Sequence, residues 1–388
     1  MVPAAEPTAA AGRSVRVLHV QKVAGIGGSE RHLLALLPSL AEVGVETRMC
    51  VLATRHAAVF VDAAERGDVD VVVMPAGPDI NPVLVPKLVA EIRRFRPDVV
   101  HTHLVHADLH GQVAARVSRV PGVSSIHGAP AFYRRQPYRS VGRLAGRLAR
   151  RRIAISEYLA GYVAELGLAP PDRIRVVPYG IDAGAWAPQE GEREQARRAM
   201  GIDDDVVTVG IASRLIEGKG LDLFVQAMAG AMSRAPDLRL LVAGDGPLRA
   251  RLTELARSTC PPGRARFLGF VADVRSFMHA CDVVAFSSSP ALGEGFGLAA
   301  LEAMAAGRPV IATDVGPLAE VVAHDVTGIV VPAGSAPRLC EAILALAQDA
   351  GLRRRMGAEG AKRAVEVFGL DAMVRRTGAV YDEVTQDG

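Results

Sequence analysis

Short runs rich in valine and isoleucine alternate along the chain with longer amphipathic stretches. One of these stretches repeats apolar residues at helical spacing between Leu221 and Met232, which places them on one helix face and predicts core packing. The apolar runs have the length of buried strands and fall at residues 15–20, 48–52, 69–74, 98–101, 123–127, 153–156, 175–178, 206–212, 238–243, 265–268, 282–287, 309–313 and 328–331. Strands that alternate with helices in this way are typical of βαβ units, so we predict an α/β fold with mainly parallel sheets.

The runs divide into two groups of similar size, joined by a segment rich in turn-forming residues. Residues 178–188 hold two glycines, two prolines and the only tryptophan, and a charged helical pattern resumes at Glu192. We therefore expect two doubly wound domains, 14–183 and 184–370, with a hinge near 182–194. Ligands of such sheets bind outside the carboxyl ends of the strands, so a ligand would lie in a cleft where the two sheets face each other.

Composition and cysteine spacing exclude several classes of protein. The 388 residues are 49% hydrophobic and 22% charged with a net charge of +3, which is typical of a globular chain. No uncharged apolar run reaches the roughly 18 residues that a membrane span needs. Residues 1–13 lack the basic start and apolar stretch of a signal peptide, so we expect a flexible tail. The cysteines stand far apart, which argues against a zinc ribbon or a disulfide framework and favours the cytoplasm: Cys50, Cys260, Cys281 and Cys340.

A glycine-rich turn marks the first candidate site. Gly295 to Gly297 follow a predicted strand and open a helix, whose first amides and positive dipole end form an anion site. Glu294 and Glu302 are eight residues apart, or roughly 12 Å along a helix. The carboxylates of a retaining glycosidase stand only about 5 to 5.5 Å apart, so this spacing suits two contacts on one extended ligand instead. The alternative is that Glu302 merely caps or solvates its helix.

A basic loop forms the second candidate site. Arg214 and Lys219 lie between a valine-rich strand and an amphipathic helix, at the carboxyl edge of the second sheet. Lysine is scarce, with four residues against 41 arginines, yet one of the four stands between two glycines in this loop. A fork-shaped guanidinium and a compact ammonium aimed at one place suit a diphosphate. The alternative is a solvated basic turn.

These motifs together resemble the retaining glycosyltransferases of family 4. The resemblance spans nearly the whole chain and is carried by Gly27-Gly28-x-Glu30, Arg214-x4-Lys219 and Glu294-Gly-Phe-Gly-Leu-x3-Glu302-Ala-Met-Ala-x-Gly-x-Pro-Val-Ile-Ala-Thr. It implies the GT-B architecture, in which two Rossmann-like domains face each other across a cleft and the second holds most of the nucleotide sugar. It also implies that residues 371–388 form a helix packed back on the first domain, and that no metal or other cofactor is required.

The resemblance implies a role for each matching residue. Arg214 and Lys219 would bind the diphosphate, Glu294 the sugar hydroxyls and Glu302 the ribose. The further implied contacts are amides around Gly295, Phe296, Gly297 and Leu298 to phosphate, Gly269 and Phe270 to the base, Gly27 and Gly28 to phosphates and acceptor, and His127 to the transferred sugar. By itself Gly25-x-Gly27-Gly28 lacks the Gly-x-Gly-x-x-Gly spacing of a dinucleotide site. The sequence departs from the family at Val315-Gly316-Pro317, where two adjacent glycines are usual.

A group of histidines lies around the end of the fourth predicted strand. A metal site built from His101, His103, His106 and His110 is one interpretation, with Asp108 the only carboxylate nearby. We instead expect no metal, and a wall in which His103, His106 and Asp108 offer hydrogen bonds to a polyhydroxylated acceptor.

Residues 109–156 hold ten arginines and no acidic residue. Arg139, Arg143 and Arg147 recur at helical spacing, which favours an anionic partner such as a phospholipid surface, a lipid diphosphate or a phosphorylated glycan. The alternative is a solvated arginine-rich face. Nucleic acid is not expected, because few aromatic residues accompany the arginines. The enzyme would then work in the cytoplasm, at the inner face of the membrane if lipid is the partner.

The expected activity is transfer of a hexosyl group from a nucleoside-diphosphate sugar, with UDP-sugars favoured, to an acceptor hydroxyl with retention. The acceptor would be a glycan, a glycolipid or a natural-product aglycone. Two alternatives stay open: a nucleotide-sugar-binding subunit without turnover, and a GT-B epimerase or phosphorylase-like enzyme. A phosphorylase needs a late lysine for its pyridoxal cofactor, and Lys362 is the only one in that part of the chain.

Overall fold

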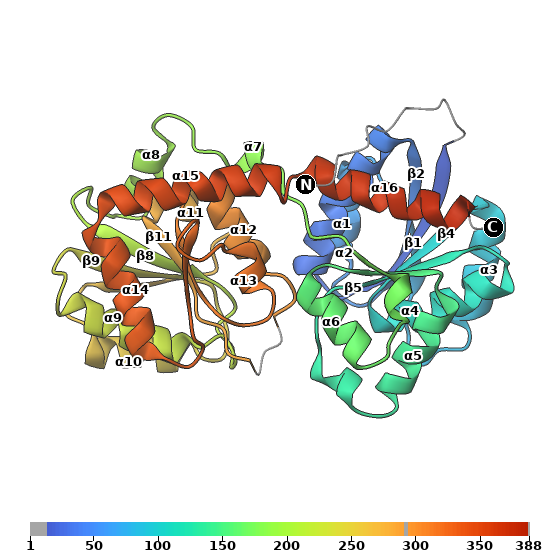
Figure 1. The fold of residues 1–388 in the computed structure, drawn as a ribbon, viewed down its shortest axis with the longest axis horizontal. Coiled ribbons are helices and arrows are strands. Elements are labelled where there is room, and N and C mark those ends of the chain that lie inside the picture. Colours follow the sequence, from blue (N-terminus) through green and yellow to red (C-terminus); the bar gives the residue numbers. More distant parts are fainter. Residues whose placement is uncertain (1–13, 291–293, 387–388) are drawn as a thin grey trace. The chain divides into compact units, whose positions relative to one another are not determined.

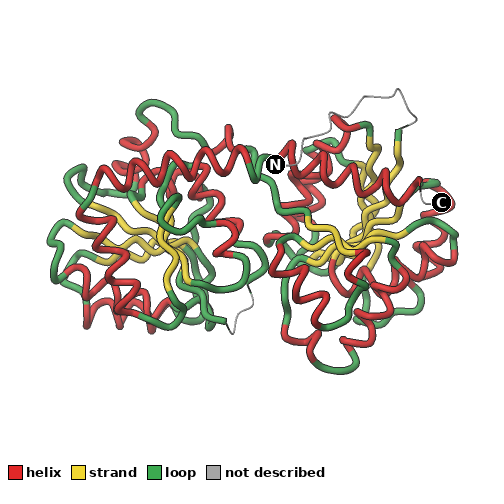
Figure 2. The backbone as a smooth tube through the Cα atoms, viewed as in Figure 1, coloured by secondary structure: helices red, strands yellow, loops and turns green. Residues whose placement is uncertain are grey.

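The structure is a computed structural model that describes residues 14–290 and 294–386 (Figure 1). The expected tail at residues 1–13 lies outside the described residues. Two parallel sheets with helices on both faces account for most of the chain (Figure 2). None of the described helices is long and apolar enough to cross a bilayer.

The first sheet has seven strands in the order β3-β2-β1-β4-β5-β6-β7. Its strands are β1 (Val15–Val23), β2 (Val45–Ala53), β3 (Asp70–Pro75), β4 (Val99–His103), β5 (Gly122–Ile126), β6 (Arg151–Ala154) and β7 (Ile174–Val176). The helices between them are α1 (Gly28–Ser39), α2 (Ala58–Arg66), α3 (Leu84–Phe95), α4 (Leu104–Val117), α5 (Tyr138–Leu148) and α6 (Glu157–Glu165). Strands β1 and β4 are parallel neighbours, with His19 paired in register with His101.

The second sheet has six strands in the order β10-β9-β8-β11-β12-β13. Its strands are β8 (Val207–Ala212), β9 (Leu238–Ala243), β10 (Ala265–Gly269), β11 (Val283–Phe286), β12 (Val310–Thr313) and β13 (Gly328–Val331). The remaining helices are α7 (Ala183–Trp186), α8 (Glu192–Ala199), α9 (Leu221–Met232), α10 (Arg249–Thr259), α11 (Val274–Ala280), α12 (Leu298–Ala305), α13 (Leu318–Val321), α14 (Ala336–Gln348), α15 (Ala350–Glu366) and α16 (Leu370–Gln386).

The order of the second sheet decides which loops meet. Strand β8 lies between β9 and β11, so the loops that follow these three strands emerge together at the carboxyl edge. Helix α9 packs on this sheet through the face predicted from its spacing, with Phe224 and Met228 fully buried in the core. The prediction of a core-facing helix over 221–232 is therefore confirmed.

Contacts between Cα atoms divide the chain into two compact units. One unit comprises residues up to 125, residues 144–151 and residues from 374 onward, and the other comprises residues 126–143 and 152–373. The carboxyl-terminal part of α16 thus belongs to the unit that contains β1 and β4, where Tyr381 is buried against His101 at 2.8 Å. The domain limits expected from the sequence, 14–183 and 184–370, stay a prediction.

Candidate functional site

The loops that follow β8 and β11 are joined by hydrogen bonds at the carboxyl edge of the six-stranded sheet. The Ser287 hydroxyl donates to the carbonyl of Lys219 at 2.9 Å, and the Ser289 amide donates to the carbonyl of Gly218 at 2.7 Å. Gly220 has a φ of +63°, and a Cβ there would stand 1.9 Å from the carbonyl oxygen of Ser287. Only glycine fits this close approach of two backbones, and the contact holds Lys219 against the second loop.

Lys219 forms an ion pair with Glu294, 75 residues further along the chain. The Lys219 Nζ lies 2.5 Å from Glu294 Oε1, and Ser288 Oγ donates to the same carboxylate oxygen at 2.5 Å. Both charged side chains are mostly buried, at 19% and 14% exposed. Ser288 is held in turn by Thr313, whose hydroxyl donates to its carbonyl at 2.7 Å. The structure therefore brings together two residues that the sequence identified separately, and adds Ser288, which the sequence reasoning missed.

Arg214 lies in the same loop as Lys219 but is exposed. Among the described residues, none forms a hydrogen bond or an ion pair with its guanidinium group. The position of Arg214 is fixed by its neighbour Leu215, whose amide donates to the carbonyl of Asp245 at 2.9 Å. The guanidinium is thus available to an anion.

The loop after β9 is a third component of this edge, and sequence reasoning missed it. Gly244 and Gly246 adopt φ values of +132° and +154°, and a Cβ on Gly244 would lie 1.8 Å from the Ser213 carbonyl oxygen. The Gly244 amide donates to the carbonyl of Gly269 at 2.6 Å, which joins this loop to the one after β10. Gly244 and Gly246 directly after a leucine-rich strand are the pattern that could have identified it.

Helix α12 begins beside Glu294. Gly297 is the residue before the helix and has a φ of +92°, and a Cβ there would lie 2.6 Å from Leu318 Cδ2. The first amides of a helix, here those of Leu298 and Ala299, have no acceptor within the helix and carry its positive dipole end. Glu302 lies in the second turn of the same helix and is only 4% exposed. The start of α12, where we expect an anion to bind, and Glu302, the expected second carboxylate, therefore belong to the same unit as Arg214.

The predicted base-binding segment follows β10. Gly269 has a φ of +73°, and the next residue, Phe270, has 81% of its surface exposed. An aromatic ring so far out of the core offers a face for stacking. Whether it contacts a base stays a prediction.

His127 directly follows β5 and is linked to the glycine-rich turn within the second unit. Its Nδ1 lies 2.7 Å from the Tyr179 hydroxyl, and the Tyr179 ring lies 5.2 Å from that of Phe296. Burial lowers the pKa of His127 to about 3, so the imidazole is neutral at physiological pH. A neutral ring can orient a hydroxyl but cannot supply a positive charge.

The histidines around β4 separate into two groups. His101 and His103 lie with His19 in a fully buried cluster, where His19 Nδ1 is 3.0 Å from His103 Nε2 and His101 Nε2 is 2.7 Å from the Ser125 hydroxyl. One nitrogen from each of these three residues lies within 4.8 Å of the others. Burial lowers the pKa of His19 to about 3, so this ring is neutral. Sequence reasoning missed His19, which pairs in register with His101.

The other histidines hold neighbouring loops. His110 Nε2 accepts from the Asn81 amide at 3.0 Å, and His106 Nε2 lies 3.3 Å from the carbonyl of Pro78. Asp108 is buried in α4 and accepts hydrogen bonds from Thr102 at 2.5 Å and Ser124 at 2.9 Å. In the structure these side chains therefore bind their own scaffold, and contacts of His103, His106 and Asp108 with an acceptor stay predictions.

Gly27 and Gly28 begin α1. Glu30 accepts from the Gly27 amide at 3.0 Å and from Gln21 Nε2 at 2.7 Å, which fixes the turn after β1. A Cβ on Gly28 would meet nothing within 4 Å, so the backbone there is open to an approaching ligand.

Arg139 and Arg143, two of the three arginines at helical spacing in α5, donate hydrogen bonds within the protein. Arg143 Nε donates to the carbonyl of Leu166 at 3.1 Å, and Arg139 Nε donates to the same carbonyl at 3.4 Å. This carbonyl ends α6, where cations are favoured by the helix dipole. Arg147 is exposed on the last turn of α5.

Comparison with known proteins identifies the family of this chain. Residues 192–363 match the family described as Glycosyl transferases group 1, and residues 26–184 match Glycosyltransferase Family 4. The chain is 32% identical over 374 residues to the D-inositol 3-phosphate glycosyltransferase of Pseudarthrobacter chlorophenolicus, covering 87% of this chain and 86% of that protein. It is 32% identical over 216 residues to the lipopolysaccharide core biosynthesis mannosyltransferase LpsB of Rhizobium meliloti, covering 54% of this chain and 60% of that protein.

Comparison with solved structures identifies the fold. The crystal structure of HepE from Anabaena in complex with UDP and glucose superimposes with a TM-score of 0.83 and 23% identity, covering 95% of this chain and all of that one. The two parallel sheets and these matches define the class of protein as a glycosyltransferase enzyme with the two-domain α/β GT-B fold. More narrowly, the chain belongs to the glycosyl transferases group 1 and is of the family 4 type. The expected fold and enzyme class are confirmed.

Proposed function

We propose that this enzyme transfers a hexosyl group from a UDP-sugar to an acceptor hydroxyl, with retention at the anomeric carbon and without a metal ion. The observation that carries the proposal is the ion pair of Lys219, from the loop that also holds Arg214, with Glu294, which stands four residues before α12. An arriving diphosphate would take Lys219 from the carboxylate. Glu294, no longer paired, would then accept hydrogen bonds from the sugar hydroxyls, so one ligand would use both members of the pair.

Retention is proposed from the resemblance of the chain to the retaining glycosyltransferases of family 4. Glu294 pairs with a lysine and Glu302 is buried within α12, so we assign neither as a nucleophile. The acceptor oxygen would attack the anomeric carbon from the face that the diphosphate leaves, and a diphosphate oxygen would take the acceptor proton. Arg214 and Lys219 would stabilise the negative charge that grows on the leaving group, which is the largest catalytic contribution we assign.

UDP is the proposed nucleotide because a solved relative of the same fold is described in complex with UDP and glucose. Phe270 would stack against the base. We propose metal independence because the cations of Arg214 and Lys219 would neutralise the diphosphate where other enzymes use a divalent ion. Activity is therefore expected to be unchanged in excess EDTA.

The acceptor is proposed to be a hydroxyl on a polyol, a glycan or a glycolipid. One relative is named for an inositol phosphate and another for a lipopolysaccharide core. All four cysteines are free thiols, which favours the cytoplasm as the place of action.

A panel of UDP-, GDP- and ADP-sugars in a thermal-shift assay tests the donor, because a ligand at 100 times its dissociation constant stabilises a protein by about 2.7 kcal/mol. The stabilising sugar nucleotide is then incubated with polyol and glycan acceptors while UDP release is followed. Transfer gives UDP release that depends on the acceptor, and proton coupling at the new anomeric centre reports retention. An enzyme that epimerises the sugar nucleotide without releasing UDP would overturn the proposal.

A further inference from the structure

A hollow lined by arginines lies in the first unit, which contains the seven-stranded sheet. It has a volume of about 300 Å³ and is formed by the last turn of α4, the loop from there to the start of β5, and the last turn of α5 with the residues that follow it. Its lining comprises Ala115, Arg116, Arg119, Val120, Pro121, Gly122, Leu148 and Arg150, and so includes three cations and no acid.

The charges of these arginines are not neutralised within the described chain. Arg116 and Arg119 are exposed, and neither guanidinium has a hydrogen bond or an ion pair to a described residue. Arg150 is half-buried and oriented, because its Nη1 donates to the carbonyl of Val384 at 2.9 Å and its amide donates to the carbonyl of Gly122 at 2.8 Å. One guanidinium is thus fixed at the hollow while two others stand open beside it.

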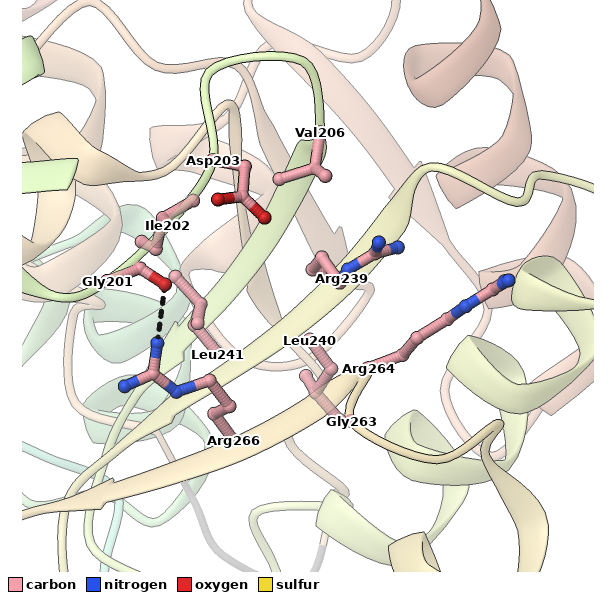
Figure 3. A pocket seen from close by; sticks show the side chains of 10 residues that line it. All are labelled: Gly201, Ile202, Asp203, Val206, Arg239, Leu240, Leu241, Gly263, Arg264 and Arg266. Carbon is pink, nitrogen blue, oxygen red and sulfur yellow. Dashed lines mark hydrogen bonds between the residues drawn. The ribbon is translucent and has the colours of Figure 1, made fainter. Parts of the chain in front are cut away.

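A second hollow is lined by arginines that have a structural role. It is lined by Arg239, Arg264 and Arg266 among others (Figure 3). Each of these guanidiniums donates to backbone carbonyls, and Figure 3 shows Arg266 directed to the carbonyl of Gly201, at 2.9 Å, on the side away from Arg264. Because neither Arg116 nor Arg119 makes such a bond to a described residue, the two hollows differ in what their cations are available to bind.

Electrostatics favours an anion with more than one charge in the first hollow. Helices α4 and α5 both end there, and Arg150 binds the carbonyl of Val384 in the last turn of α16, so three helix ends contribute about −0.5 of a charge each. The lining has three arginines, which leaves a surplus of about 1.5 positive charges. This surplus matches a phosphate group, whose oxygens suit guanidinium forks.

We propose that this hollow binds a phosphate group. Two exposed apolar residues lie on the same two helices: Val117, which follows Arg116, and Leu144, one turn before Leu148, are 61% and 48% exposed. The phosphate could be that of a phospholipid headgroup, with these side chains in the apolar boundary of the membrane, or that of a soluble ligand. The proposed site does not include the arginines of α5 that the sequence predicted to face an anion. Two of these, Arg139 and Arg143, bind the end of α6.

The chain offers a matched pair of variants. Arg119 and Arg96 each follow the end of a helix with a left-handed backbone, at φ values of +58° and +52°, and both are exposed. Glycine suits that conformation, so R119G and R96G remove one charge each without straining the backbone. Only R119G changes the hollow. R116Q provides a second variant that keeps the helix.

Two probes distinguish the sources of phosphate. Inorganic phosphate is titrated by calorimetry, and vesicles of phosphatidylcholine with or without 30 mol% phosphatidylglycerol are used in co-sedimentation. We expect R119G and R116Q to weaken binding of at least one probe about tenfold, and R96G to change it less than twofold. Loss in the vesicle arm alone identifies a lipid headgroup, and loss in the phosphate arm alone identifies a soluble ligand. Equal binding by R119G and R96G in both arms, or no binding by the wild type, overturns the proposal.

Discussion

The close contact at Gly220 allows a sharp test of how the site is built. Replacing Gly220 with alanine places a methyl group 1.9 Å from the Ser287 carbonyl oxygen, where about 3.3 Å is the usual closest separation of carbon and oxygen. The loops after β8 and β11 would have to separate by more than 1 Å, or roughly 1.4 Å. The left-handed backbone, at φ +63°, costs a further ~1–2 kcal/mol for alanine. Together with ~1–3 kcal/mol for the forced repacking, the expected loss of unfolding free energy is about 2–5 kcal/mol.

Gly263 provides the control for the backbone cost. Its φ is +77°, and a Cβ there would meet nothing within 4 Å. G263A should therefore lose only the ~1–2 kcal/mol of the left-handed conformation. Urea unfolding followed by circular dichroism gives both values, and calorimetric titration gives the UDP affinity. We expect G220A to bind UDP at least tenfold more weakly, because Lys219 moves with the loop, and G263A to bind it unchanged. If the two variants match in stability and in affinity, the junction of the two loops does not position Lys219.

Three further predictions address charge and protonation. K219M should lower the rate at saturating sugar nucleotide about a hundredfold, or ~3 kcal/mol, and a loss below threefold would remove Lys219 from transition-state stabilisation. E294Q should tighten binding of UDP alone severalfold, because Lys219 no longer has a competing carboxylate. Transfer from the sugar nucleotide should fall in the same variant. Weaker UDP binding would contradict the proposal that Lys219 leaves Glu294 for the diphosphate. Burial lowers the pKa of His19 and His127 to about 3, against about 6.5 in the unfolded chain, so the unfolded state binds more protons between these values. The contribution of each histidine to stability is then complete above about pH 6.5 and falls toward pH 3 by ~1.4 kcal/mol per pH unit. Urea midpoints at pH 7.0 and 5.5 that coincide would show that neither histidine is buried neutral.

The sequence predicted the elements well because their pattern is local. Valine-rich runs at 15–20 and 206–212 correspond to β1 and β8, and the helical spacing over 221–232 corresponds to α9. Hydrophobic periodicity is sufficient for such elements, since parallel strands are buried on both faces. The motif residues Arg214 and Lys219 could be found in the same way, because glycines and cations after a strand have few structural uses.

Contacts between distant segments could not be read from local pattern. The pairing of Lys219 with Glu294 depends on β8 and β11 being neighbours, which the chain order does not specify. His19 lies within a buried strand, and nothing in its surrounding residues indicates that it faces His101. The spacing of arginines in α5 predicts a charged face but not that Arg143 meets the carbonyl at the end of α6. A side chain's partner depends on tertiary packing, and single-sequence periodicity does not contain it.

Crystals of the protein grown with UDP would test the central claim most directly. We predict density for the diphosphate within hydrogen-bonding distance of Arg214 and of the first amides of α12, with the Lys219 ammonium withdrawn from Glu294 and bound to a phosphate oxygen. UDP bound elsewhere, with the Lys219 and Glu294 pair still intact at 2.5 Å, would contradict it.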